Sequence, residues 1–341
     1  MEPSNPLSNK KGEESLLKVK GISLFSGGLD STLAVKVILE QGIEVLGVTF
    51  KTPFFGEKKA KAAAKIIGLT LTIIDITEEH LEILKAPKYG YGKNMNPCID
   101  CHTLMLKIAG GIMKDAGADF IFTGEVLGQR PMSQTKQSLH VVAKNSGYQD
   151  YIIRPLSAKL LPETKCETEG KVDRQRLLAI RGRSRKNQIE LAQRYGITGY
   201  AAPAGGCLLT DPMFTKRLRD LFAYHRNFLT RDIELLKHGR HFRIDDASKI
   251  IVGRNSFENE SLERLSTGED VLIHMAQFPG PTVLVPSKSD DTTVHYAASL
   301  CALYSDAPKD EDVVVVCRKG DSSQTIRIKA AQREDAEQRM I

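Results

Sequence analysis

The chain has 341 residues, of which 41% are hydrophobic and 26% charged, and its formal net charge is +6. This composition is typical of a globular protein with room for two domains. Residues 1–16 contain no apolar stretch that would serve as a signal peptide, and no run approaches the roughly 18 apolar residues of a membrane span. We therefore expect a cytoplasmic protein with no membrane partner, a disordered N-terminus over 1–16, and no structural disulfide framework among its six cysteines.

Strand and helix signals alternate through the first half of the chain. The predicted strands cover residues 19–26, 43–50, 69–77, 119–124 and 151–156, and the predicted helices cover 30–42, 57–67 and about 103–116. Repeated βαβ units with near-continuous apolar strands predict an α/β fold, a doubly wound parallel sheet with helices on both faces. Such sheets bind ligands at the carboxyl ends of their strands.

A polar loop follows the first predicted strand, in the stretch GISLFSGGLDSTLAV at 21–35. Gly27 and Gly28 allow a tight curl that aims backbone N–H groups and the positive end of the next helix at an anion. Further hydroxyl donors come from Ser26, Ser31 and Thr32. The loop is neither a Walker A sequence nor GxGxxG, so it predicts a phosphate site of another kind.

Asp30 stands in the middle of this loop. A carboxylate beside a phosphate is repulsive unless a cation such as Mg²⁺ lies between them. The alternative is that Asp30 or Ser31 only caps the helix. Because capping needs neither glycine, the pattern favours a phosphate site with a cation.

Three motifs carry a resemblance to a known superfamily. SGGLDS, between the first strand and the first helix, resembles the pyrophosphate loop of the N-type ATP pyrophosphatases, which bind the β and γ phosphates of ATP while a substrate oxygen attacks the α phosphate. TGEVLGQRPMSQT (123–135) resembles a loop of the 4-thiouridine synthetases, and NPCIDC (96–101) is similar to the cysteine motif of the 2-thiouridylases. Over 17–213 the resemblance implies an adenine nucleotide alpha hydrolase-like domain that uses ATP, tRNA and a sulfur donor. It implies ATP contacts at Ser26, Gly27, Gly28, Asp30, Ser31, Thr32 and Gly124.

The cysteines fit this resemblance. Cys98 and Cys101 form a CxxC, and Cys207 lies in the loop PAGGCLLTDP, whereas Cys301 and Cys317 lie in apolar runs and are expected to be inert. Three thiolates suit a [4Fe–4S] cluster with one iron left open, which some thiolases of this superfamily use. Two alternatives stay open: a persulfide and disulfide-forming pair, and structural zinc with Cys166 or His102 as fourth ligand.

The chemistry explains why both features share one domain. A uracil oxygen is a poor leaving group, so it is first adenylated, and a sulfur nucleophile then displaces AMP. We expect Asp30 with Mg²⁺ to serve activation, and Cys98 and Cys207 to serve substitution. Glu125, Gln129 and Arg130 either face the nucleotide or base, or belong to an ordinary polar loop.

The remainder of the chain is predicted to be a separate module. Residues 214–238 are expected to form a helical connector, and 239–341 a smaller α+β domain. The stretches IIVGRNSFENESL, VLIHMAQFPGPTVLV and AASLCALYS resemble, in order, the NFACT-R domain, which implies RNA binding. The alternative is a small domain that only packs on the first. Neither the RNA-capturing domain nor the rhodanese-like domain of the archetypal 4-thiouridine synthetase is expected in this chain.

A basic segment at 171–186 holds seven Lys or Arg against one acid, Asp173. Such a segment is typical of a phosphate-backbone contact, and a solvated helix face is the alternative. The predicted RNA-binding residues are Arg181, Arg183, Arg185, Lys186 and Arg254. We expect an ATP-dependent tRNA sulfurtransferase that makes thiouridine, with an ATP-dependent amide or C–N ligase and a non-catalytic RNA-binding protein as alternatives.

Overall fold

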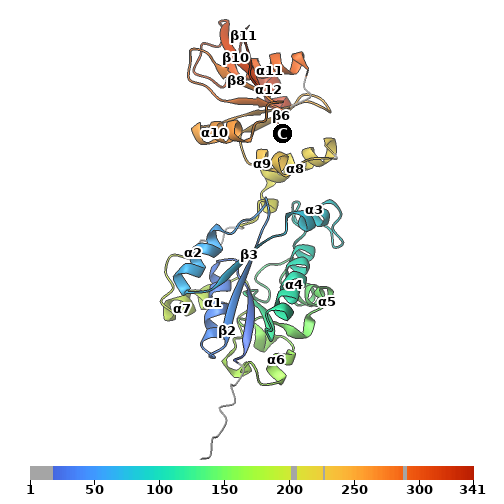
Figure 1. Ribbon diagram of the computed structural model, residues 1–341, viewed down its shortest axis with the longest axis vertical. Coiled ribbons are helices and arrows are strands. Elements are labelled where there is room, and N and C mark those ends of the chain that lie inside the picture. Colours follow the sequence, from blue (N-terminus) through green and yellow to red (C-terminus); the bar gives the residue numbers. More distant parts are fainter. Residues whose placement is uncertain (1–17, 201–205, 226, 287–289) are drawn as a thin grey trace, which may run out of the picture. The chain divides into compact units, whose positions relative to one another are not determined.

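The computed structural model describes residues 18–200, 206–225, 227–286 and 290–341, so the predicted disordered segment 1–16 lies outside the described residues. The chain divides into two compact units (Figure 1). The first contains the residues up to Gly92 together with Pro97–Ala204, and the second contains Lys93–Asn96 and Gly205–Ile341. In the described part of the chain, none of the helices has the length and apolar character that crossing a membrane requires.

The first unit is built on a five-stranded sheet with the order β3-β2-β1-β4-β5, in which every neighbouring pair is parallel. Its strands are β1 (Lys20–Leu24), β2 (Glu44–Lys51), β3 (Leu71–Asp75), β4 (Phe120–Thr123) and β5 (Ile152–Ile153). After β1, the chain adds β2 and β3 on one side of β1 and then adds β4 and β5 on the other side. The carboxyl ends of β1 and β4 therefore flank the switch point at which such sheets bind ligands.

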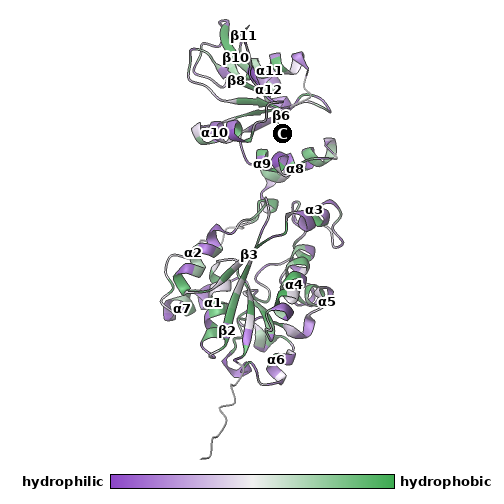
Figure 2. Cartoon of the chain, in the orientation of Figure 1, coloured by the Kyte–Doolittle hydropathy of each residue, from purple (hydrophilic) through white to green (hydrophobic). Residues whose placement is uncertain are grey.

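Helices cover both faces of this sheet, as the sequence predicts. The helices of the first unit are α1 (Leu29–Leu39), α2 (Lys58–Ile67), α3 (Thr77–Lys85), α4 (Cys98–Asp115), α5 (Lys136–Ser146), α6 (Lys165–Thr168) and α7 (Lys186–Arg194). Phe120 and Phe122 of β4 pack with α1, α2 and α7, whereas Ile121 packs with α4 and α5. This alternation explains why the middle of the sheet is largely hydrophobic on both faces (Figure 2).

Two local predictions for the first unit are wrong. Helix α4 begins at Cys98, five residues before the predicted start, because Pro97 sets the N-terminus and Asp100 in the first turn complements the helix dipole. The basic segment forms no long helix before Lys186, and only the short turn η3 (Arg174–Arg176) is helical. The alternative of a solvated helix face therefore does not describe Arg181 or Arg183.

The second unit is a smaller α+β domain, as predicted. Its six-stranded antiparallel sheet has the order β11-β10-β8-β9-β7-β6. The strands are β6 (Arg240–Arg243), β7 (Lys249–Val252), β8 (Val271–Met275), β9 (Val283–Val285), β10 (Val313–Lys319) and β11 (Ser322–Ile328), and the longer helices are α8 (Pro212–Tyr224), α10 (Ser256–Leu265) and α11 (Asp291–Leu303). The short helices are α9 (Thr230–Leu235) and α12 (Arg333–Arg339).

The second unit begins earlier than the predicted boundary at 239. Helices α8 and α9, which lie in the predicted connector 214–238, belong to it. Leu235 of α9 packs with Ile251 of β7, and Arg217 of α8 donates to the backbone oxygen of Leu236 at 2.9 Å. These contacts make the two helices part of the second domain instead of a free connector.

Candidate functional site

The glycine-rich loop joins β1 to α1 at the switch point of the sheet. Gly27 has a φ of +72°, and a Cβ there would lie 2.4 Å from the backbone oxygen of Lys59, so only glycine fits. Gly28 is the N-cap of α1, which has no side-chain cap. The first N–H groups of α1 are thus left for another acceptor, which fits the predicted phosphate site and not the capping alternative.

The hydroxyl side chains of the loop lie together at the start of α1. Ser31 Oγ and Thr32 Oγ1 donate to the backbone oxygen of Gly28 at 2.9 and 3.0 Å, and Ser31 Oγ lies 3.2 Å from Ser26 Oγ. Gly124 follows β4 and lies against the same turn, since a Cβ there would be 2.4 Å from the backbone nitrogen of Ser31. The structure therefore brings all seven predicted ATP-binding residues to one end of α1.

Asp30 is oriented by one neighbour and keeps one oxygen uncommitted. Gln129 Nε2 donates to Asp30 Oδ2 at 2.9 Å, and Gln188 Nε2 lies 3.4 Å from Gln129 Oε1. Asp30 Oδ1 is buried without a hydrogen-bond partner among the described residues. Burial raises the pKa of Asp30 above its usual value, although the Gln129 hydrogen bond, the charges of Arg185 and Arg130 and the nearby amide of Gln188 oppose the rise. A buried carboxylate oxygen with no donor fits a hard cation such as Mg²⁺.

Arg185 is a candidate for the phosphate site, although the sequence predicts it to bind RNA. It belongs to the basic segment, but its charge acts on Asp30, and its buried Nε has no hydrogen-bond partner among the described residues. The end of the segment reaches the site because Gly182 N donates to Leu127 O at 2.8 Å. No local sequence signal separates Arg185 from the arginines beside it.

The rest of the basic segment divides into two groups. In the first group each cation is paired with another group of the protein. Lys171 pairs with Asp119, Arg174 pairs with Glu167, and Arg176 donates to the backbone oxygen of Glu40. Arg181 and Arg183 are exposed and form no ion pair with a described residue, while Lys186 lies 3.9 Å from Glu190. Three of the four predicted RNA residues of the segment are therefore accessible beside the loop that follows β4.

Glu125 is buried, and its carboxylate is hydrogen-bonded to Arg154 and His102. Its carboxylate accepts from Arg154 Nε at 3.0 Å and lies 2.9 Å from His102 Nδ1. Burial alone would raise the pKa of Glu125, but the charges and hydrogen bonds of Arg154 and His102 lower it to about 2. Glu125 is thus an anion that fixes the loop, while its neighbour Gln129 reaches the site.

Cys98 and Cys101 lie on the first turn of α4, three residues apart and hence on one side of the helix. Cys207 belongs to the second unit, where it is the N-cap of the short turn η4 (Leu208–Thr210). Within that unit, Asn94 Nδ2 donates to the backbone oxygen of Thr210 at 2.7 Å. This hydrogen bond joins the chain segment that precedes Cys98 to the segment that follows Cys207.

The described residues contain no group of three or more His, Cys, Asp or Glu side chains placed to hold one metal ion. Cys166 Sγ lies 3.1 Å from the backbone oxygen of Asp119, and burial raises the pKa of its thiol to about 11. Burial likewise raises the thiol pKa of Cys301 to about 12 and that of Cys317 to about 11. These three thiols are protonated at neutral pH, which disfavours them as ligands.

Arg254, the predicted RNA contact of the second unit, is half-exposed and paired. Its Nε donates to Glu258 at 2.9 and 3.0 Å, so part of its charge is balanced within α10. The pair lies at the start of α10, where Asn255 caps the helix. Arg254 is therefore a weaker candidate for an RNA phosphate than Arg181 or Arg183.

Comparison with known families confirms the resemblance of both parts of the chain. Residues 17–159 match the family model described as thiamine biosynthesis protein (ThiI), and residues 239–340 match the model described as NFACT protein RNA binding domain. Proteins named probable tRNA sulfurtransferase are similar to the first part. Those from Thermococcus kodakarensis and Caldanaerobacter subterraneus are both 33% identical over 146 residues, which is 40% of this chain and 36% of each relative. The chain thus spans about a third of the length of the curated relatives it matches.

Solved structures resemble the chain more distantly. A 4-thiouridine synthetase in complex with RNA and bound ATP is 23% identical, with a TM-score of 0.38, over 57% of this chain and 45% of that one. The C-terminal part of a fibronectin/fibrinogen-binding protein from Streptococcus suis is 14% identical, with a TM-score of 0.28, over 47% of this chain and 79% of that one.

Proposed function

We propose that the protein is an ATP-dependent tRNA sulfurtransferase that adenylates a uracil carbonyl and replaces its oxygen with sulfur. The observation that carries the proposal is the arrangement around Asp30. A buried carboxylate with one uncommitted oxygen lies beside an uncapped helix N-terminus and two arginines. This combination of groups suits a triphosphate with its cation. The names of the relatives that match residues 17–159 support sulfur transfer to tRNA.

In this proposal the loop from Ser26 to Thr32 holds the β and γ phosphates of ATP. The N–H groups at the start of α1 and the hydroxyl of Ser26 would bind phosphate oxygens, while Ser31 and Thr32 hold the loop in shape through their hydrogen bonds to the backbone oxygen of Gly28. A magnesium ion held by Asp30 Oδ1 would neutralise charge that develops on the phosphates. Arg130 and Arg185 add positive charge at the same end of the sheet and favour attack of a uracil oxygen on the α phosphate.

The second half-reaction is assigned to the cysteines. We propose that Cys98, Cys101 and Cys207 act together, either as ligands of a [4Fe–4S] cluster or as carriers of a persulfide. The shared side of Cys98 and Cys101 on α4 fits two ligands of one cluster. A cluster with an open iron would supply a bound sulfide as the nucleophile. Because Cys166 is buried and protonated, it does not favour the structural-zinc alternative.

The tRNA is the proposed macromolecular partner. Arg181 and Arg183 present two uncompensated positive charges next to the loop that follows β4. The second unit matches a family whose description is RNA binding. A basic surface beside the activation site and a second RNA-binding module favour a polynucleotide substrate over a small one.

The proposal is tested with the purified full chain, prepared without oxygen and incubated with unmodified tRNA, ATP, Mg²⁺ and sulfide. Nucleoside mass spectrometry of the tRNA is expected to show a thiouridine, formed together with equal amounts of AMP and pyrophosphate. A control without tRNA is expected to release neither product. Release of AMP and pyrophosphate with a nitrogen nucleophile, and no thionucleoside with sulfide, would favour the amide or C–N ligase instead.

Two arginines of the basic segment are expected to differ in effect. Arg185→Ala removes a charge that acts on Asp30, so we expect tRNA-dependent pyrophosphate release to fall roughly 10- to 100-fold at saturating tRNA. Arg183→Ala removes an exposed charge, so we expect weaker tRNA binding, a salt slope lower by about 0.7 to 0.9, and an unchanged KM for ATP. If Arg185→Ala changes only tRNA affinity, as Arg183→Ala does, Arg185 belongs to the RNA surface.

A further inference from the structure

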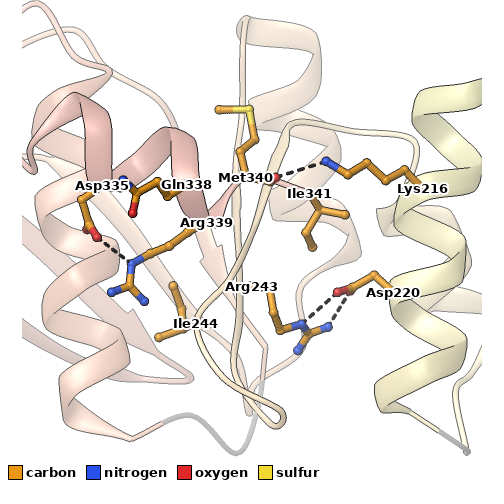
Figure 3. A pocket seen from close by; sticks show the side chains of 9 residues that line it. All are labelled: Lys216, Asp220, Arg243, Ile244, Asp335, Gln338, Arg339, Met340 and Ile341. Atoms are coloured by element: carbon orange, nitrogen blue, oxygen red, sulfur yellow. Dashed lines mark hydrogen bonds and ion pairs between the residues drawn. The ribbon is translucent and has the colours of Figure 1, made fainter.

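The second unit contains an open cavity of about 620 Å³ that the proposed reaction does not use (Figure 3). Its walls come from α8, from the end of β6 and from the C-terminal segment of the chain. The residues that line it are Lys216, Asp220, Arg243, Ile244, Asp335, Gln338, Arg339, Met340 and Ile341. The volume is that of a ligand pocket, for which roughly 300 to 1000 Å³ is typical, and its lining combines charged side chains with Ile244, Met340 and Ile341. The cavity therefore suits a polar ligand.

Positive charge exceeds negative charge among the side chains at this cavity. Asp220 Oδ2 lies 2.6 Å from Arg243 Nη2 and 3.3 Å from Nζ of Lys249, so one carboxylate serves two cations. Lys249 stands behind the wall and is only 7% exposed. Burial lowers the pKa of Lys249 to about 8, although Asp220 favours its charged form. The lowered pKa shows that one carboxylate does not fully compensate the buried ammonium group.

Two further cations complete the lining. Arg339 pairs with Asp335 at 3.0 Å, and Lys216 Nζ meets only the backbone oxygen of Met340, at 3.3 Å. Counted over their side chains, the cations of this group are Lys216, Arg243, Lys249 and Arg339, and the anions are Asp220 and Asp335. The lining side chains alone are three cations and two anions, so one more negative charge at Ile341 would balance them, and the group as a whole then stays positive through Lys249 behind the wall. The cavity thus has the electrostatic character of an anion site.

Two of the cations have donors to spare. Arg243 is largely used, since its Nε and Nη2 donate to Asp220 and its Nη1 lies 3.3 Å from two backbone oxygens, which takes four of its five N–H groups. Arg339 uses Nε on Asp335 and stacks over the ring of Tyr296, which leaves its terminal nitrogens without a hydrogen-bond partner among the described residues. Lys216 is exposed and keeps two of its three N–H groups. Arg243 therefore shapes the wall, while Lys216 and Arg339 are the available donors.

We propose that this cavity binds a phosphate group of the RNA backbone, with Lys216 and Arg339 as its donors. The inference rests on the proposed function, because it assumes that the second unit meets RNA while the first performs the reaction. Ammonium and guanidinium donors in a positively charged cavity bind phosphate oxygens and carry no sequence information. The contact therefore serves affinity and orientation, and it does not select the uracil.

The test compares two double variants of the full chain with the same loss of charge. Lys216→Ala with Arg339→Ala removes both donors, and Arg219→Ala with Arg333→Ala removes two exposed arginines on the same two helices, outside the cavity. We expect the first variant to lose roughly 10-fold or more in tRNA affinity and about 1.4 to 1.8 from the salt slope, and the second to change little. The single variant Lys216→Ala, at an exposed position, is expected to show half of the change in slope without loss of folding.

A second arm of the test identifies the source of the phosphate. Inorganic phosphate is titrated against wild-type protein and the cavity variant, with binding followed by ³¹P line broadening. Weak phosphate binding that the cavity variant loses, together with the tRNA effect, supports the proposal. Equal tRNA affinities for the two double variants overturn it, and so does binding of inorganic phosphate only. Thiouridine formation by the wild type decides the proposed function separately, because neither variant changes a residue of the first unit.

Discussion

Asp30→Ala is expected to lower tRNA-dependent pyrophosphate release at least about 100-fold while the protein stays folded. The carboxylate of Asp30 offers a cation a negatively charged, buried oxygen that has no hydrogen-bond partner among the described residues. Without it the negative charge that develops during adenylation meets no fixed cation, and such a loss costs several kcal/mol in transition-state energy. Pyrophosphate release at saturating ATP and tRNA is the direct measurement.

Asp30→Asn is the matched control for the shape of the site. The amide keeps the volume of the side chain and a partner for Gln129, but it lacks the charge. We expect it to be nearly as inactive as Asp30→Ala, and excess Mg²⁺ to restore little activity to either. Because burial already disfavours the ionised form of Asp30, neither change should lower the melting temperature by more than a few degrees. Wild-type pyrophosphate release by either variant would remove Asp30 from the mechanism.

The sequence predicts the phosphate loop well because its determinants are local. Gly27 needs its positive φ within the turn itself, and the apolar runs on either side predict β1 and α1. The same holds for the central strands β1 and β4, which are mostly buried on both faces and hence largely apolar. These features follow from neighbours along the chain.

The role of Arg185 does not follow from such neighbours. It lies in a run of basic residues that have the same composition signal, and the contact between Gly182 and Leu127 decides which of them reaches Asp30. Arg174 and Arg176 in the same run are used for internal contacts with Glu167 and Glu40. A charge pattern therefore predicts that a surface is basic, whereas the tertiary fold determines which charge serves the site.

The domain boundary was missed for a similar reason. Helices α8 and α9 are amphipathic, and their sequence does not say which sheet covers their apolar sides. Leu235 packs beside Ile251, and Asp220 pairs with Arg243 and Lys249 of the second sheet. The pair of Asp220 and Arg243 also lines the cavity in Figure 3, so its proposed phosphate site could not be inferred from the sequence.

Alanine at Cys98, Cys101 or Cys207 is expected to abolish thiouridine formation while tRNA-dependent pyrophosphate release continues. Activation depends on the loop at α1, whereas substitution depends on the thiols at the start of α4 and before η4. If the three thiolates hold a [4Fe–4S] cluster, protein purified without oxygen should absorb broadly near roughly 400 nm and contain about four iron atoms per chain. Each of the three substitutions should remove that absorption.

Cys301→Ala is the matched control, because Cys301 is a fully buried thiol in the core of the second unit. Its loss should cost on the order of 1 kcal/mol in stability and leave colour and thiouridine unchanged. Metal content and colour then distinguish the three hypotheses for the cysteines, namely the cluster, structural zinc and the persulfide pair. A colourless anaerobic protein with stoichiometric zinc rejects the cluster. A colourless, metal-free protein that accepts a sulfane sulfur from a persulfide donor onto one thiol favours the cysteine pair. If all three variants retain iron and still form thiouridine, the assignment of sulfur transfer to these cysteines is contradicted. The role of Asp30 in activation is tested separately, by pyrophosphate release.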